Sequence, residues 1–210
     1  MKALSESRQA LSARIRGDWP VETQLMLRFG RCILQVQVNR EDITADLKRY
    51  FRPFVVEGGE ADILISVHEA PEYTLPVEFT VKPPEPGKTK IKEAYHDLPD
   101  GRLVRKQLTG MLFVFGEGDN VAVGPCRANL NQVINFINNR YIEWLLCRGC
   151  LLGHAAGVVL NGKGLAMAGF SGAGKSTLAL HLMNEGATFV SNDRLMIEKH
   201  KNGLVMHGVA

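Results

Sequence analysis

The segment that most restricts the fold of this chain is an octapeptide, GFSGAGKS, at residues 169–176. It follows a short apolar run at 165–168 and precedes residues 177–183, which are mostly good helix formers. Gly186 then supplies the residue type that most often ends a helix. This order predicts a strand, a glycine-rich loop and a helix. A loop of this kind turns its backbone N–H groups toward an anion at the helix N-terminus.

The octapeptide has the spacing of a P-loop, G-x-x-x-x-G-K-S. In this pattern Lys175 would place a positive charge at the β- and γ-phosphates of a nucleotide, and Ser176 would offer its hydroxyl to Mg²⁺. The spacing differs from G-x-G-x-x-G, which disfavours a dinucleotide site of the Rossmann type. The alternative is a glycine-rich turn without a ligand. The sequence predicts a nucleoside triphosphate site whose binding residues are Gly169, Ser171, Gly172, Ala173, Gly174, Lys175, Ser176 and Thr177.

A carboxylate is expected beside this loop. P-loop proteins hold or orient the metal with an acidic side chain from a neighbouring strand. The β-type run at 187–190 is followed, two residues later, by Asp193. We therefore expect Asp193 to hold Mg²⁺ together with Ser176. The alternative is that Asp193 is only a turn or capping residue, because strand ends favour aspartate.

Three sequence features together resemble the ATP-binding half of HPr kinase/phosphorylase and the HPr-kinase-related proteins. They are the H-A-A sequence at 154–156, the P-loop between a strand and a helix, and the V-S-N-D sequence at 190–193. The resemblance covers about residues 150–200. Its specific part is the histidine before the loop and the aspartate after it, and the fold it implies is shared with the phosphoenolpyruvate carboxykinases.

The resemblance implies the chemistry of that family. It implies binding of ATP with Mg²⁺ and transfer of a phosphoryl group to a serine or threonine of a small phosphoacceptor protein similar to HPr. It implies catalytic roles for Asp193, His154 and Lys175, with His154 near the phosphate end of the site. It also implies that copies of the chain can form a homo-oligomer.

Asn192 departs from the family pattern, which has two acidic residues at this strand end. An amide cannot accept a proton from a serine hydroxyl. If the general base belongs at the first of these positions, Asn192 cannot act as the base and phosphoryl transfer is strongly impaired. If it belongs at the second position, Asp193 supplies it. Two other functions therefore stay open: an ATP-sensing binding module without phosphoryl transfer, and a kinase that acts on a small metabolite.

The rest of the chain has a different pattern. Apolar residues alternate over much of 21–125 and take helical spacing at 41–54, which predicts a mostly antiparallel sheet with one helix. The proline-rich segment 71–90 predicts a loop or an edge excursion. Residues 128–148 have apolar side chains three and four apart, which is typical of one long helix with a buried stripe.

We therefore expect an α/β chain with two domains. An α+β domain with a mostly antiparallel sheet is expected at 1–127. A P-loop domain with a mixed sheet, similar to HPr kinases and carboxykinases, is expected at 128–210, where 128–149 forms a connecting helix. The segment after Ser176 is short for a P-loop kinase core, so this domain is expected to be truncated at its C-terminus.

The composition excludes several classes of protein. Hydrophobic residues make up 45% of the chain and charged residues 22%, so a packed core is expected. A formal net charge of +3 is too small by itself to indicate nucleic-acid binding. No apolar run approaches the roughly 18 residues of a membrane helix, and residues 1–20 are polar, unlike a secretory signal. We therefore expect no nucleic-acid partner, no membrane partner and a cytoplasmic location.

Cys147 and Cys150 form a C-x-x-C pair, which occurs in redox and zinc sites. The other two cysteines, Cys32 and Cys126, are isolated, so no second pair completes a zinc site. The pair also falls at the end of the helix expected at 128–148. We interpret both cysteines as core-facing thiols at a helix end.

Overall fold

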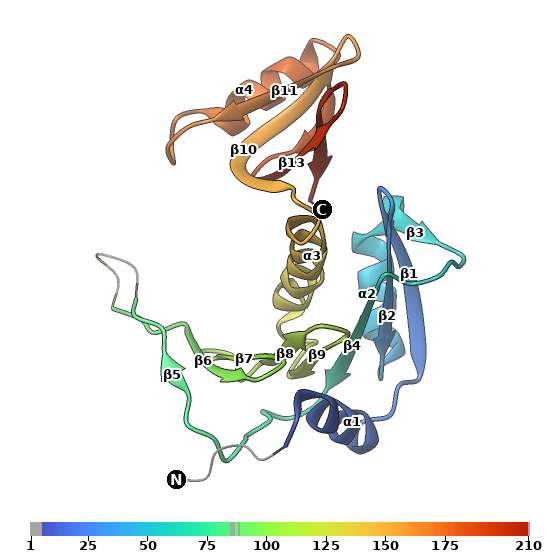
Figure 1. Ribbon diagram of the computed structural model, residues 1–210, viewed down its shortest axis with the longest axis vertical. Helices are drawn as coiled ribbons and strands as arrows, with labels where there is room; N and C mark the ends of the chain where they lie inside the picture. Colours follow the sequence, from blue (N-terminus) through green and yellow to red (C-terminus); the bar gives the residue numbers. More distant parts are fainter. Residues whose placement is uncertain (1–5, 85–86, 88, 210) are drawn as a thin grey trace. The chain divides into compact units, whose positions relative to one another are not determined.

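The computed structural model describes residues 6–84, 87 and 89–209. Within these residues the chain forms four α-helices, one 3-10 helix and fourteen strands in two sheets (Figure 1). The mixed α/β class expected from the sequence is confirmed. None of the helices in the described part of the chain is long and apolar enough to cross a lipid bilayer.

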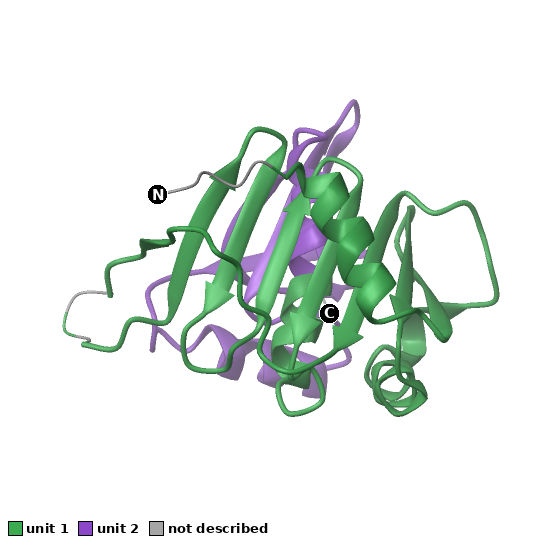
Figure 2. Cartoon of the chain, turned by 90° about the horizontal axis from the view of Figure 1, so that it is seen from below, with its two compact units in different colours: residues 1–137 green, residues 138–210 purple. Residues whose placement is uncertain are grey.

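Two compact units divide the chain between residues 137 and 138 (Figure 2). The division lies within helix α3, Leu130–Leu146. The long helix expected at 128–148 is therefore present and slightly shorter at both ends. Each unit has its own sheet.

The first unit is built on a nine-stranded sheet. Its strands are β1 (Thr23–Phe29), β2 (Cys32–Val38), β3 (Val55–Val56), β4 (Ile63–Glu69), β5 (Thr80–Val81), β6 (Glu93–Leu98), β7 (Gly101–Lys106), β8 (Leu112–Gly116) and β9 (Asp119–Gly124). Their order is β3-β1-β2-β4-β9-β8-β7-β6-β5. The β2–β4 and β4–β9 pairs are parallel and the other pairs are antiparallel. The expected sheet is thus mostly antiparallel, with two parallel pairs at its centre.

Parallel pairs need crossover connections, because a tight hairpin joins only antiparallel strands. Helix α2 (Glu41–Tyr50), the 3-10 helix η1 (Arg52–Phe54) and β3 fill the connection from β2 to β4. Strands β5 to β8 fill the connection from β4 to β9. The segment expected to be a loop or an edge excursion at 71–90 contributes the two-residue edge strand β5. Residues 85, 86 and 88 of that segment lie outside the described residues.

Helix α1 (Arg8–Asp18) packs on the first sheet. Its residues Leu11 and Ile15 are fully buried in a cluster with side chains of β8 and β9. In the sequence, residues 1–20 stand out only as polar, and 1–5 of them lie outside the described residues. Two apolar residues four positions apart are enough to dock one face of a short helix.

Arg8 joins α1 to the sheet through a buried charge. Its side chain is only 2% exposed, and its guanidinium donates hydrogen bonds to three backbone carbonyls at the β6–β7 and β8–β9 turns. The acceptors belong to Asp100, at 3.0 Å from Nε, and to Glu117 and Asp119. A Cβ at Gly101 would clash with the backbone oxygen of Phe115 in the paired strand and would lie 2.8 Å from Cδ of Arg8, so the glycine leaves room for both. Nothing in the polar sequence around Arg8 predicted this contact.

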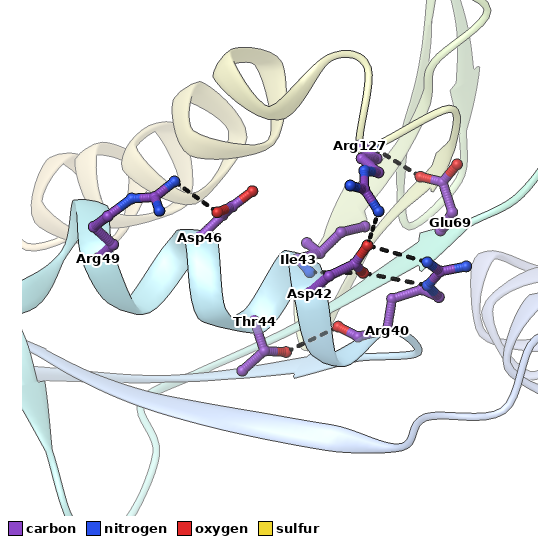
Figure 3. A network of polar contacts seen from close by, with 8 residues as sticks. All are labelled: Arg40, Asp42, Ile43, Thr44, Asp46, Arg49, Glu69 and Arg127. Atoms are coloured by element: carbon purple, nitrogen blue, oxygen red, sulfur yellow. Dashed lines mark hydrogen bonds and ion pairs between the residues drawn. The ribbon is translucent and has the colours of Figure 1, made fainter.

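Polar contacts link the N-terminus of α2 to the segment between β9 and α3 (Figure 3). Asp42, in the first turn of α2, forms ion pairs with Arg40, at 3.0 Å, and with Arg127. The backbone N–H of Arg127 donates to Oε2 of Glu69 at 2.7 Å. The hydrogen bond from Arg40 lowers the pKa of Asp42 below its ordinary value. Because these side chains are largely exposed, the pairs orient the two segments more than they stabilise the fold.

The second unit holds a five-stranded sheet. Its strands are β10 (Leu151–Leu160), β11 (Lys163–Ala168), β12 (Thr188–Ser191), β13 (Arg194–His200) and β14 (Gly203–Gly208). β10 pairs with β11 along one edge and with β12 and then β13 along the other, and β14 pairs with β13. These pairs are all antiparallel in the described residues, so the prediction of a mixed sheet in this unit is wrong. The reason is that β11 and β12 run in the same direction but lie on either side of β10, instead of pairing with each other.

Helix α4 (Lys175–Asn184) packs on one face of this sheet. Ala179 of the helix is buried against Ala156 and Val158 of β10. These side chains are small, which lets the helix approach the sheet closely. Gly186 follows the helix with a φ of 93°, the left-handed conformation that glycine adopts at a helix end. The helix and its end therefore lie where the sequence predicted them.

Helix α3 ends in a glycine turn that separates the two cysteines. Gly149 has a φ of 83°, and the N–H of Cys150 donates to the carbonyl of Leu145 at 3.1 Å. Cys150 is buried and Cys147 is exposed. The predicted helix end is correct, but only Cys150 faces a core. The left-handed turn at Gly149 reverses the chain, so that Cys150 is buried while Cys147 stays exposed.

Candidate functional site

The P-loop segment forms a tight turn between β11 and α4. Gly172 and Gly174 have φ values of 81° and 82°, a left-handed conformation that favours glycine. The N–H of Ala173 donates to the carbonyl of Phe170 at 3.1 Å, which closes the turn. Gly174 is the N-cap of α4 and has no side chain to cap the helix. The first N–H groups of a helix have no partner within it, so this end of α4 can receive an anion.

A pocket of about 460 Å³ opens beside this turn. Its lining comes from the loop, from the first turn of α4, from β10 and from the link between β12 and β13. The lining residues are His154, Ser171, Gly172, Ala173, Gly174, Lys175, Ser176, Thr177, Asn192 and Asp193. Of the residues expected from the sequence to bind nucleotide or to act on it, Gly169 is the one that does not line the pocket. A Cβ at Gly169 would lie 3.3 Å from Cβ of Ala173, so Gly169 allows the loop to close on itself.

The side chain of Lys175 folds back against the loop. Its Nζ donates hydrogen bonds to the carbonyls of Gly169, at 2.8 Å, and Phe170, at 3.1 Å. Both acceptors are uncharged backbone carbonyls. A phosphate oxygen would be a stronger partner than a carbonyl oxygen, because it carries a negative charge that attracts the ammonium group.

His154 and Asp193 meet at the wall of the pocket. Nδ1 of His154 lies 2.9 Å from Oδ1 of Asp193 and 3.2 Å from its backbone oxygen. The N–H of Ala155 also donates to the backbone oxygen of Asp193, at 3.2 Å. Both side chains are well exposed, at 59% for His154 and 67% for Asp193. The break between β12 and β13 therefore places a carboxylate beside β10, on the same pocket as the loop.

The donor set of the pocket fits a magnesium–nucleotide complex. Mg²⁺ prefers oxygen ligands and is usually bound through one or two carboxylates, with water and substrate phosphates completing its shell. Ser176 offers a hydroxyl and Asp193 a carboxylate, while Asn192 offers an amide oxygen in place of a second carboxylate. No cluster of three or more histidine, cysteine, aspartate or glutamate side chains suited to a metal ion occurs in the described part of the chain.

Arg194 is a neighbour of the pocket that the sequence did not single out. It is paired directly with His154 in the β10–β13 register. Its Nη1 donates to Oδ1 of Asn139, in α3, at 2.9 Å, and its backbone oxygen accepts a hydrogen bond from Oγ of Ser191 at 2.6 Å. The strand register that places Arg194 opposite His154 depends on contacts 40 residues apart and has no local signal.

Comparison with known proteins gives no match: no protein-family model, no curated protein and no solved structure matches this chain. The roles of the pocket residues depend on their chemistry and on the sequence pattern that they share with P-loop proteins.

Proposed function

We propose that the chain binds ATP with Mg²⁺ in this pocket and transfers the γ-phosphoryl group to a serine or threonine hydroxyl of a small protein. One observation carries the proposal. The P-loop octapeptide forms a left-handed glycine turn at the N-terminus of α4, and the pocket beside it is also lined by a carboxylate, Asp193. The sequence resemblance to HPr kinases, carried by residues 154–156 and 190–193, supports the choice of a protein hydroxyl as acceptor.

Each residue of the pocket has its own role in transfer of the γ-phosphoryl group. The loop N–H groups and Lys175 hold the phosphates and offset the charge of the transferring group. Ser176 and Asp193 would hold Mg²⁺, which when bound adds positive charge at the phosphates. Asp193 also orients the acceptor hydroxyl and takes its proton as the new P–O bond forms and the bond to the β-phosphate oxygen breaks. His154 fixes the Asp193 carboxylate through Nδ1. Most of the rate gain then comes from positioning and charge stabilisation.

Calorimetric titration with Mg-ATP tests the binding step. Lys175→Ala should abolish measurable binding, because it removes the one ammonium group among the residues that line the pocket. Lys163→Ala is the matched control, since Lys163 is exposed at the start of β11 and does not line the pocket. Unchanged affinity in Lys175→Ala would remove the P-loop interpretation.

A second function, an ATP-sensing module that transfers no phosphate, is favoured by Asn192. Its amide lines the pocket where the related kinases have a carboxylate. Incubation of the wild-type chain with γ-labelled ATP and candidate acceptor proteins separates the two functions. Labelled protein supports the kinase, binding without labelling supports the sensor, and a labelled small molecule supports a metabolite kinase.

A further inference from the structure

Arg194 lies next to the pocket in the strand register without lining it, and the proposed mechanism gives it no role. It is the first residue of β13 and pairs directly with His154 of β10. Directly paired residues of antiparallel strands point to the same face of a sheet, with Cβ atoms about 4.5–5.5 Å apart. Because His154 lines the pocket, Arg194 leaves the sheet on the pocket side, one residue after Asp193.

The pocket carries less positive charge than a bound triphosphate demands. Among its lining residues, Lys175 is the only lysine or arginine. The triphosphate of ATP has about four negative charges at neutral pH, and one Mg²⁺ offsets two of them. P-loop enzymes commonly complete this balance with an arginine that contacts the transferring phosphoryl group, in cis or from a partner.

The hydrogen bond from Arg194 to Asn139 of α3 can be replaced by a hydrogen bond to a phosphate oxygen. Nη1 donates to the amide oxygen of Asn139 at 2.9 Å, and an amide oxygen is a weaker partner for a guanidinium than a phosphate oxygen. The guanidinium stands at the end of a flexible side chain, so it can change partners while β13 stays in place. The backbone of Arg194 is held independently, by the hydrogen bond from Ser191.

We propose that Arg194 binds the terminal phosphate of the nucleotide, exchanging the oxygen of Asn139 for a phosphate oxygen. Arg194 thereby makes the pocket distinguish a nucleoside triphosphate from a diphosphate. This inference rests on the proposed function, because it needs a nucleotide in the pocket.

The test compares Mg-ATP and Mg-ADP binding by calorimetry in the wild type and in Arg194→Ala. A hydrogen bond to a charged group corresponds to roughly a ten- to hundredfold change in affinity. Arg194→Ala should weaken ATP binding by about tenfold or more and leave ADP binding within about threefold, so the ATP-to-ADP preference falls. Arg194→Lys should recover part of that preference, and it serves as the second variant if Arg194→Ala does not fold by circular dichroism.

Asn139→Ala is the matched control. It removes the amide oxygen that competes with phosphate for Nη1 of Arg194, so the ATP-to-ADP preference should stay equal or rise. An unchanged preference in Arg194→Ala, or an equal fall in Asn139→Ala, would overturn the inference while leaving the proposed function in place. If the wild type binds neither nucleotide, the proposed function itself fails, and this inference fails with it.

Discussion

Replacement of Arg8 by methionine tests how the first unit is held together. Methionine keeps much of the length and apolar stem of arginine but removes its five N–H donors. The change therefore leaves the packing of α1 on the sheet largely intact. It takes away the hydrogen bonds to the carbonyls of Asp100, Glu117 and Asp119.

The expected loss of stability follows from burial and from the number of acceptors. A hydrogen bond to a charged group contributes about 1.5–3 kcal/mol, but burying the guanidinium costs several kcal/mol in desolvation. Removal of one member of a buried charged network typically costs about 3–5 kcal/mol. The three carbonyls lie at turns, where water can replace part of what they lose. We therefore expect Arg8→Met to lower the free energy of unfolding by about 3 kcal/mol.

Urea denaturation followed by tryptophan fluorescence measures this loss in the first unit. The chain has two tryptophans, and Trp144→Phe leaves Trp19 as the reporter, whose ring lies 5.5 Å from that of Tyr73. Arg14→Met is the control, because Arg14 is on the same helix but 44% exposed, and it should cost less than about 1 kcal/mol. Equal effects of the two substitutions, or a loss below 1 kcal/mol for Arg8→Met, would refute the role of the buried guanidinium.

Two further predictions concern pH and the loop. Burial lowers the pKa of His68 to about 4, whereas the unfolded imidazole has a pKa near 6.5, so the unfolded chain binds the additional proton between these values. The contribution of His68 to the free energy of unfolding is therefore complete above pH 6.5 and falls by up to about 3 kcal/mol as the pH drops toward 4. Urea denaturation at several pH values measures this dependence. The same dependence of the unfolding free energy on pH in His68→Gln would contradict the prediction. Gly174→Ala should weaken Mg-ATP binding at least tenfold in calorimetry, because a left-handed conformation costs alanine about 1–2 kcal/mol and the loop must shift to relieve it. Gly186→Ala is the control, because it introduces similar backbone strain at the other end of α4, and it should bind Mg-ATP with the affinity of the wild type. The same affinity in Gly174→Ala and Gly186→Ala would argue against the loop as the binding site.

Elements with strong local signals could be predicted from the sequence. Strands β1 and β2 follow the alternation of apolar residues expected within 21–125, because that alternation fixes the buried face of each strand. Helix α4 begins and ends at glycines, and both have positive φ. The loop residues 171–177 line one pocket because they are consecutive in the chain, so a local pattern is enough to gather them.

Features that depend on distant contacts could not be predicted. The parallel β4–β9 pair joins residues more than 50 positions apart, and nothing in either strand specifies that partner. Arg8 looks like a solvated residue in a polar segment, and only the turns far along the chain turn it into a buried contact. The error about the second sheet has the same origin, since no local signal shows that β10 separates β11 from β12. Arg194 was missed because its place opposite His154 is set by that register.

The central claim is that the backbone amides of the loop bind the phosphates of a nucleotide, and amide NMR of the wild-type chain tests it most directly. On titration with Mg-ATP, we expect the ¹H–¹⁵N resonances of Gly172, Gly174, Lys175 and Ser176 to shift progressively and saturate. Mg²⁺ with adenosine, which lacks phosphates, should leave them in place. Loop resonances that do not move at saturating Mg-ATP, or that move equally with adenosine, would contradict the account.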